Sequence, residues 1–395
     1  MRVLVAWDNP AEAELLSLYL NVGDDEAQIT HSADDALRLA QKNTWDAVLM
    51  ALGNGQEEEV YRVFQRIREQ LPDCPVVGVC DAGSVFNIAR YLTNGMRSYL
   101  LRDRQGDFIF LVRSTLESVI DAVRAEREKA LADRLRQEIE AVRKLQESII
   151  PRNIQCPPGY RICARYEPSQ IHVVGGKPVI LAGGDYYDVF TLTDDNLVIL
   201  VGDASGHGMK ACMSIMTMHT LVRMIRGQRY QDTASFVEEI NRRLCEQSII
   251  HGEGGFITLF YAVLKPNEHQ LQWTSAGHPL PIAYDRQREC LQPIGADAQT
   301  GLPLGIYPDV RYETHTLPLA PHMRLVLYTD GLVEAFEANT STSYGLEGLL
   351  RTVRRTRDLD LEQALQALFD DSFASTGGQG RHDDTSVVLL ERAMP

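Results

Sequence analysis

The strongest constraint on the fold is a short apolar segment that ends in an acidic residue and a glycine turn. Residues 198–201 (VILV) have the pattern of a buried strand, and Asp203 and the turn at 206–208 follow directly. The next segment, 209–226, contains no proline, is rich in Met, Ala and Leu, and predicts a helix. A carboxylate at the end of a rigid strand can hold a hard cation, and glycine lets the backbone approach it closely. Taken alone, the stretch is equally compatible with an ordinary loop.

Three further acidic clusters lie at predicted strand ends or glycine turns. They are GGDYYD at 183–188, Asp330 after the apolar run 325–328, and the pair 383–384 before the predicted strand 386–390. Buried like charges repel one another, so this set would be costly without cations. Since the chain has neither Cys/His ligand spacing nor a phosphate-binding loop, the pattern favours an oxygen-ligated magnesium or manganese centre over zinc.

In this order, the stretches GGDYYD, GDASGHG, TDGLVEA and HDDTSVVLL resemble the metal-dependent Ser/Thr protein phosphatases of the bacterial SpoIIE/RsbU type, which are relatives of protein phosphatase 2C. The stretches TSAGHPLPI and GLPLGI also resemble this family, and the likeness spans roughly Leu145 to Leu390. It implies an α-β-β-α sandwich of two stacked antiparallel sheets flanked by helices. Residues 155–393 are expected to be mostly strands. The sequence predicts two helices at 209–226 and 233–247, a hairpin of 257–264 with 270–275, and another hairpin turn at 175–178.

The resemblance also implies the site residues. Asp203 would bridge two Mn²⁺ or Mg²⁺ ions, the carbonyl of Ala204 would bind one of them, and Asp330 and Asp383 would hold the other. Asp185 would order metal-bound water; it is counted among the metal-site residues and, with Asp203, as catalytic. Two ions about 3.5–4 Å apart would ionise a bridging water near neutral pH and neutralise the phosphoryl charge.

Other polar residues near these stretches are weaker candidates. Asp188 and Asp384 could lie behind the ligands or form a third, weaker metal site, although Asp384 could equally cap a turn. His207 and His278 lie in Gly-His sequences that look structural, and neither they nor His382 is favoured as the general acid.

Residues 1–106 alternate between short apolar segments and helical patterns. This α/β alternation predicts a parallel sheet covered on both faces, and it resembles the flavodoxin-like receiver domain of response regulators. The predicted strands are 2–7, 27–31, 47–52, 75–80 and 98–101, and the predicted helices are 11–20, 33–41, 57–69 and 85–93.

The phosphorylation chemistry of a receiver is not retained. Only Asp8 remains of the usual acidic pair, and Ala51 aligns with the phospho-accepting aspartate. Cys80, Arg102 and Asp103 align with the usual Thr or Ser, Lys and Pro. Since alanine cannot accept a phosphoryl group, we expect a pseudoreceiver that is neither phosphorylated nor dependent on magnesium. It could be a folded spacer or dimerisation module, or it could be regulated by a bound partner or ligand.

The segment 107–150 contains neither glycine nor proline and predicts one long amphipathic helix. Its apolar stripe favours a parallel two-chain coiled coil and hence a homodimer, over a solvated helix packed along its own domain. The chain therefore divides into the pseudoreceiver (1–106), this linker and a phosphatase-type domain (151–395). The stripe consists of Val119, Val123, Leu131, Leu135, Ile139, Val142, Leu145 (or Gln146) and Ile149.

Composition limits the partners and the compartment. The net charge of −15 argues against a nucleic-acid surface or an anionic membrane as the main partner. Seven scattered cysteines without a CxxC pair argue against a disulfide framework and for a reducing cytoplasm. The chain opens directly on a predicted strand without a signal-like segment, and no apolar run is long enough to span a bilayer.

These observations lead to one main functional hypothesis and two alternatives. The chain is expected to be a cytoplasmic, metal-dependent Ser/Thr phosphoprotein phosphatase in bacterial signalling, regulated by the pseudoreceiver through the linker. The resemblance implies a phosphorylated anti-sigma-factor antagonist as the substrate class. A catalytically silent pseudophosphatase that acts as a binding scaffold is the alternative. A nucleotide or diguanylate-type enzyme is disfavoured because the chain lacks a Gly-Lys-Ser/Thr loop.

Overall fold

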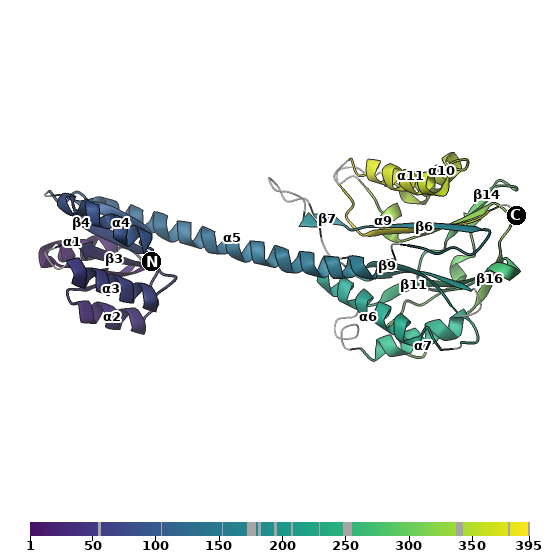
Figure 1. The fold of residues 1–395 in the computed structure, drawn as a ribbon, viewed down its shortest axis with the longest axis horizontal. Coiled ribbons are helices and arrows are strands. Elements are labelled where there is room, and N and C mark those ends of the chain that lie inside the picture. Colours follow the sequence, from purple (N-terminus) through teal and green to yellow (C-terminus); the bar gives the residue numbers. More distant parts are fainter. Residues whose placement is uncertain are drawn as a thin grey trace. The chain divides into compact units, whose positions relative to one another are not determined.

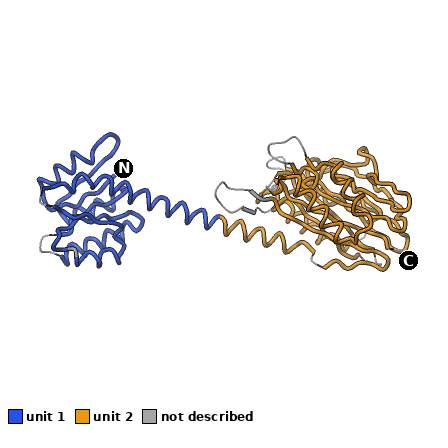
Figure 2. Tube along the Cα trace, turned by 90° about the horizontal axis from the view of Figure 1, so that it is seen from above, with its two compact units in different colours: residues 1–135 blue, residues 136–395 orange. Residues whose placement is uncertain are grey.

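The computed structural model has the chain in two units, Met1–Leu135 and Arg136–Pro395 (Figure 2). The boundary falls inside helix α5 (Ile109–Ile149), which contributes residues to both. The residues that the structure describes are 1–53, 57–103, 105–151, 153–171, 179–180, 183–192, 196–206, 208–228, 230–247, 255–336, 343–377 and 380–393.

The first unit is a parallel sheet with helices on both faces. Its strand order is β2-β1-β3-β4-β5, which is the flavodoxin-like order, so the fold expected for this region is confirmed. The strands are β1 (Arg2–Ala6), β2 (Glu26–Thr30), β3 (Ala47–Leu52), β4 (Val76–Asp81) and β5 (Ser98–Arg102). The helices are α1 (Pro10–Leu20), α2 (Ala33–Lys42), α3 (Glu57–Gln70) and α4 (Val85–Thr93), with a 3₁₀ turn at Ala82–Ser84.

Local sequence explains these elements well. All six residues of β3 (AVLMAL) are buried, as expected for a central parallel strand with both faces covered. Helix α1 begins where Asn9 accepts a hydrogen bond from the Ala11 amide and Pro10 occupies the first turn. The first part of α5 packs on the same face of the sheet as α1, through Val112 and Leu116, and closes the core of the first unit.

The second unit contains two sheets whose strand pairs are antiparallel except for the short parallel pair β12–β15. One has the order β15-β12-β11-β10-β9, with β16 paired to β12, and the other has the order β14-β13-β17-β18-β6. The first sheet consists of β9 (Asp185–Thr191), β10 (Leu197–Ala204), β11 (Ile257–Lys265), β12 (Gln270–Ala276), β15 (Thr300–Gly301) and β16 (His315–Pro318). The second consists of β6 (Tyr160–Glu167), β13 (Ile282–Asp285), β14 (Cys290–Pro293), β17 (Met323–Tyr328) and β18 (Thr385–Arg392). A small separate pair is formed by β7 (Gln170–Ile171) and β8 (Val179–Ile180).

Helices cover the outer faces of both sheets, which gives the expected α-β-β-α sandwich (Figure 1). Alternate residues of β10 separate the two cores on either side of it: Val198 and Leu200 pack under the helices, whereas Ile199 and Val201 pack between the sheets. The helices are α6 (Met209–Ile225) and α7 (Thr233–Cys245) on one side, and α9 (Asp330–Val333), α10 (Gly345–Arg355) and α11 (Leu361–Ala374) on the other.

Most sequence predictions for this unit are confirmed, and some elements were missed. The two helices after the glycine turn are α6 and α7, and the predicted hairpin is β11–β12, with a 3₁₀ turn at Pro266–Glu268. The reading of the remaining region as mostly strands was wrong for α10 and α11. Their signals were present: Leu361, Leu365 and Leu368 follow helical spacing, and Asp360 caps the first turn. The predicted turn at 175–178 lies outside the described residues.

The predicted linker helix is present, and residues 145 and 146 near its C-terminal end differ in burial. Gln146 is 1% exposed, whereas Leu145 is 56% exposed, so the buried face near the C-terminal end of α5 carries an amide instead of a leucine. Among the helices that the structure describes, none combines the length and the apolar character needed to cross a bilayer.

Candidate metal centre and active site

Two of the predicted site residues lie opposite each other on neighbouring strands. Asp185, the first residue of β9, is paired in register with Asp203 near the end of β10. Asp203 lies two residues after Val201, whose side chain packs between the sheets, so the carboxylate points into the same space. Ala204 ends β10 and is buried, and its amide donates to the Gly184 carbonyl at 2.9 Å.

The second sheet brings the remaining acidic residues to the same edge of the sandwich. Asp330 follows β17 and starts α9, whereas Asp383 and Asp384 directly precede β18. A Cβ atom on Gly331 would lie 1.8 Å from the backbone oxygen of Asp384, so only glycine allows these two segments to approach so closely. The four acidic segments, far apart in sequence, thus meet at one place.

The pKa values of the clustered carboxyl groups show that these charges affect one another. Burial, together with Asp330, Asp383 and Asp384, raises the pKa of Asp203 to about 8. Burial and the Asp203 charge raise the pKa of Asp185 well above its usual range, and burial raises that of Asp330. Burial also raises the pKa of Asp383, to about 6. The cluster therefore holds negative charge poorly at neutral pH unless a cation compensates it.

Hydrogen bonds fix two of these carboxylates. The Thr329 hydroxyl donates to Asp185 Oδ2 at 2.6 Å and accepts from the Ser386 amide at 2.8 Å. Asp384 accepts from the amides of Ser169 and Gly184, at 2.8 and 2.7 Å. Both oxygens of Asp384 are thus used by backbone donors, which makes this residue a tether between the segments. The contacts of Thr329 and Ser169 depend on pairings of distant segments, and the sequence carried no signal for them.

A buried glutamine of α5 holds the turn that precedes Asp185. The Gln146 side-chain amide donates to the carbonyl oxygens of Gly183 and Asp185, at 3.1 and 3.2 Å, and its oxygen accepts from the Gly183 amide at 2.8 Å. A single side chain therefore ties the end of the long helix to the backbone on both sides of Gly184. The sequence offered only the ambiguity between positions 145 and 146 as a hint of this contact.

The donor set fits a divalent cation that prefers oxygen ligands. It consists of carboxylates and, at Ala204, a backbone carbonyl close to Asp203. One oxygen of Asp330, Oδ1, is buried without a hydrogen-bond partner among the described residues, which is costly unless another group occupies the site. In the described part of the chain, no group of three or more acidic, histidine or cysteine side chains lies at ligand distances.

The other polar candidates have different partners. Asp188 lies three residues after Asp185 and therefore on the opposite face of β9, where it accepts from Tyr186 and pairs with Arg223, both at 2.9 Å. His278 is buried, with Nδ1 2.9 Å from the Thr258 hydroxyl, and burial lowers its pKa to about 3. His382 is stacked on Phe336, with ring centroids 4.9 Å apart. His207 lies outside the described residues.

The α-β-β-α sandwich with an acidic cluster between its sheets is the fold of protein phosphatase 2C-type domains. Among solved structures, the SiaA-PP2C domain of Pseudomonas aeruginosa matches with a TM-score of 0.53 and 20% identity, over 68% of this chain and 100% of that chain. A family model described as Stage II sporulation protein E (SpoIIE) matches residues 193–393, half of the sequence. The chain belongs to the SpoIIE family, and the resemblance seen in the sequence is confirmed.

Curated relatives match over part of their length. Protein IcfG of Synechocystis is 24% identical over 280 residues, which is 65% of this chain and 42% of that protein. Phosphoserine phosphatase RsbU of Bacillus subtilis is 26% identical over 219 residues, which is 54% of this chain and 61% of that protein. The chain thus spans less than two thirds of the length of either relative.

Replacing Asp203 by Asn should stabilise the metal-free chain, and more so as the pH rises. The pKa of Asp203 is about 8 in the folded state, against roughly 4 for an unfolded chain. The unfolded state therefore releases its proton first, and stability is lost between these two pH values. We expect the melting temperature of Asp203→Asn in EDTA to exceed that of the wild type slightly at pH 5 and clearly at pH 8.

The exposed Asp309→Asn is the matched control for the loss of one negative charge in the same unit. If the melting temperatures of Asp203→Asn and the wild type changed equally with pH, the pKa of Asp203 would not be raised in the folded state.

Proposed function

We propose that this chain is a metal-dependent protein serine/threonine phosphatase in bacterial signalling, acting on phosphoserine or phosphothreonine in a partner protein. The observation that carries the proposal is the meeting of Asp185 and Asp203 from one sheet with Asp330 and Asp383 from the other. Membership of the SpoIIE family supports this assignment. The likeness to RsbU, named a phosphoserine phosphatase, supports the same chemistry.

The site residues have distinct roles in this proposal. Asp203, the Ala204 carbonyl, Asp330 and Asp383 would together hold two Mn²⁺ or Mg²⁺ ions. When bound, such ions supply a water that ionises near neutral pH and neutralise the phosphoryl charge. Asp185, held in one orientation by Thr329, positions the attacking water. His278 is neutral at physiological pH because its pKa is about 3, so it does not protonate the leaving group.

The substrate and compartment follow from the relatives and from the cysteines. We propose a phosphorylated anti-sigma-factor antagonist as the substrate, on the likeness to RsbU. All seven cysteines are described by the structure and all are free thiols, which fits a reducing cytoplasm.

The purified chain should hydrolyse a generic phosphate ester such as p-nitrophenyl phosphate in the presence of Mn²⁺, and Asp203→Asn should lower kcat about 10³-fold. Loss of the Asp203 carboxylate would weaken binding of an ion that neutralises the phosphoryl charge, and this neutralisation is worth several kcal/mol. The measurement is initial rate against Mn²⁺ concentration, with exposed Asp309→Asn as control. Metal binding by calorimetry without turnover would favour the pseudophosphatase scaffold.

We further propose that α5 regulates the site through Gln146. Its three hydrogen bonds hold Gly183 and the carbonyl of Asp185, so a rotation or shift of the helix end would move Asp185 relative to Asp203. The helix begins in the pseudoreceiver unit, where it packs on the sheet through Val112 and Leu116. Helix α5 is therefore the continuous element through which a signal received in the first unit would reach the active site.

Gln146→Ala should weaken Mn²⁺ binding roughly tenfold, since losing the buried hydrogen bonds frees the turn before Asp185 and leaves polar backbone groups unsatisfied. Leu145→Ala, on the exposed side of the same helical turn, is the matched control and should leave binding unchanged. Calorimetric titration with Mn²⁺ measures both. Equal affinities in the two variants would rule out a role of Gln146 in the site.

We also propose that the chain is a homodimer through a parallel coiled coil of α5. Leu131 and Leu135 are 60% and 55% exposed on this helix, within the predicted apolar stripe. Charged and small residues occupy the positions around them, as in a two-stranded coil.

Leu135→Glu should convert the dimer to a monomer in sedimentation velocity at micromolar concentration, because it buries like charges across the seam. Ala132→Glu adds the same charge to an exposed position outside the stripe and should leave the dimer intact. A monomeric wild type would refute the coiled coil.

A further inference from the structure

The pseudoreceiver has an open crevice at the edge of its sheet where ligands bind in related folds. In doubly wound sheets with strand order 2-1-3-4-5, ligands occupy the space beyond the carboxyl ends of β1 and β3, where the strand order reverses. The structure has a cavity of about 330 Å³ there. Its lining comes from the ends of β1, β2 and β3 and from α2 and α3, and includes Asp8, Met50, Ala51, Glu59 and Val63.

The crevice differs chemically from the phosphorylation site that the receiver resemblance would place here. Ala51 stands at the position aligned with the phospho-accepting aspartate and contributes only a methyl group to the floor. Arg102 donates to both oxygens of Asp8, at 2.9 and 3.2 Å, and also pairs with Glu12. The Arg102 guanidinium thus supplies the positive charge beside Asp8. The space above Ala51 remains open to a ligand.

The lining determines which ligand chemistry fits. The floor is apolar, with Ala36, Met50 and Val63 all buried. The lining includes the carboxylates Asp8 and Glu59 and contains no lysine or arginine among the described residues. Arg102 already compensates Asp8, so Glu59 is the carboxylate of the lining that can pair with a positive charge on a ligand.

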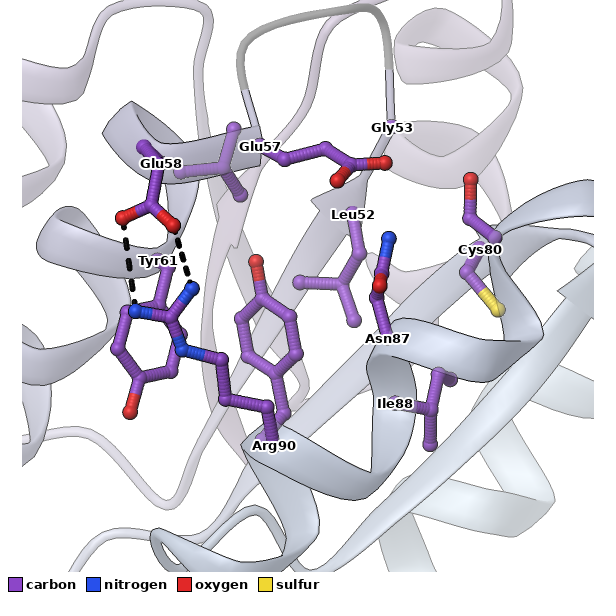
Figure 3. Close-up of a pocket in the computed structure, with 12 residues that line it drawn as sticks. Leu52, Gly53, Glu57, Glu58, Tyr61, Cys80, Asn87, Ile88 and Arg90 are labelled. Carbon is purple, nitrogen blue, oxygen red and sulfur yellow. Dashed lines mark hydrogen bonds and ion pairs between the residues drawn. The ribbon is translucent and has the colours of Figure 1, made fainter.

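A second, smaller hollow adjoins the crevice and shares Gly53 and Val60 with it. Figure 3 shows Arg90 extended across the Tyr61 ring and paired with Glu58 on one side of this hollow, and Cys80 on the other. It measures about 180 Å³, and Arg90 already compensates Glu58, at 2.6 Å. The larger crevice is therefore the better site for a cationic ligand.

We propose that the crevice over β1, β2 and β3 binds a small organic amine. The protonated nitrogen lies beside Glu59, and the apolar body packs on Met50, Ala51 and Val63. The pseudoreceiver is then a small-molecule sensor in which ligand occupancy replaces phosphorylation. The SpoIIE family match begins at residue 193 and assigns nothing to this unit, and the proposal holds whether or not the second unit is a phosphatase.

Calorimetric titration of the full chain with 2-phenylethylamine and with 3-phenylpropionate tests this proposal, since the two probes share a ring and differ in charge. We expect saturable one-to-one binding of the amine with a Kd on the order of 1 mM or tighter, as befits so small a ligand, and no binding of the carboxylate. Ala51→Leu fills the floor and should abolish binding of the amine. Glu59→Gln should weaken it roughly five- to tenfold, the effect of one partly exposed charge pair.

Glu57→Gln is the matched control, because it removes the same charge from the same helical turn but lines the smaller hollow. It should bind the amine like the wild type. If Ala51→Leu fails to fold in a thermal melt, the comparison of Glu59→Gln with Glu57→Gln decides. Absence of amine binding at about 10 mM, equal or tighter binding of the carboxylate, or identical affinities in Glu59→Gln and Glu57→Gln would overturn the proposal.

Discussion

Mutual repulsion among buried carboxylates is the constraint on which the organisation of the second unit depends. Asp185 and Asp203 face each other across neighbouring strands, and the other sheet brings Asp330, Asp383 and Asp384 to the same edge. The raised pKa values show that this arrangement is unfavourable for the charged protein alone. The sandwich supplies the compensating stability through its three apolar layers, and the proposed metal ions would relieve the repulsion.

The cluster keeps its geometry because the backbone around it is tied by buried hydrogen bonds. Asp384 accepts hydrogen bonds from two backbone amides, and Thr329 connects Asp185 to the start of β18. Gly331 permits the contact that brings α9 against the segment before β18. Gln146 adds a tie from outside the sandwich, so the one long helix of the chain ends on the turn that carries Asp185. The end of α5 and the acidic cluster are therefore connected by the same few hydrogen bonds.

The first unit has the strand order of a flavodoxin-like fold, whereas the residues at its sheet edge differ from the receiver pattern. Its five parallel strands and their order are those expected of a receiver, since hydrophobic packing on both faces maintains the sheet regardless of what lies at its edge. At that edge, Arg102 satisfies Asp8 and Glu12 internally, and Ala51 leaves an apolar floor. This edge is also where the crevice of the proposed amine site lies.

The sequence by itself determined the fold class of both units, the extent of α5 and the acidic residues of the candidate site. Strand alternation and helical spacing are local properties and predicted the first unit and α5, whereas the sandwich and its acidic site were expected from the resemblance to the SpoIIE/RsbU type. It did not identify α10 and α11, although the cap at Asp360 was readable. Only the tertiary structure decided that Asp384 is a tether, that Asp188 faces away from Asp185, that Gln146 reaches Gly183, and that Ala51 opens a crevice. Each of these depends on which distant segments pack together, and no local pattern in a single chain encodes that pairing.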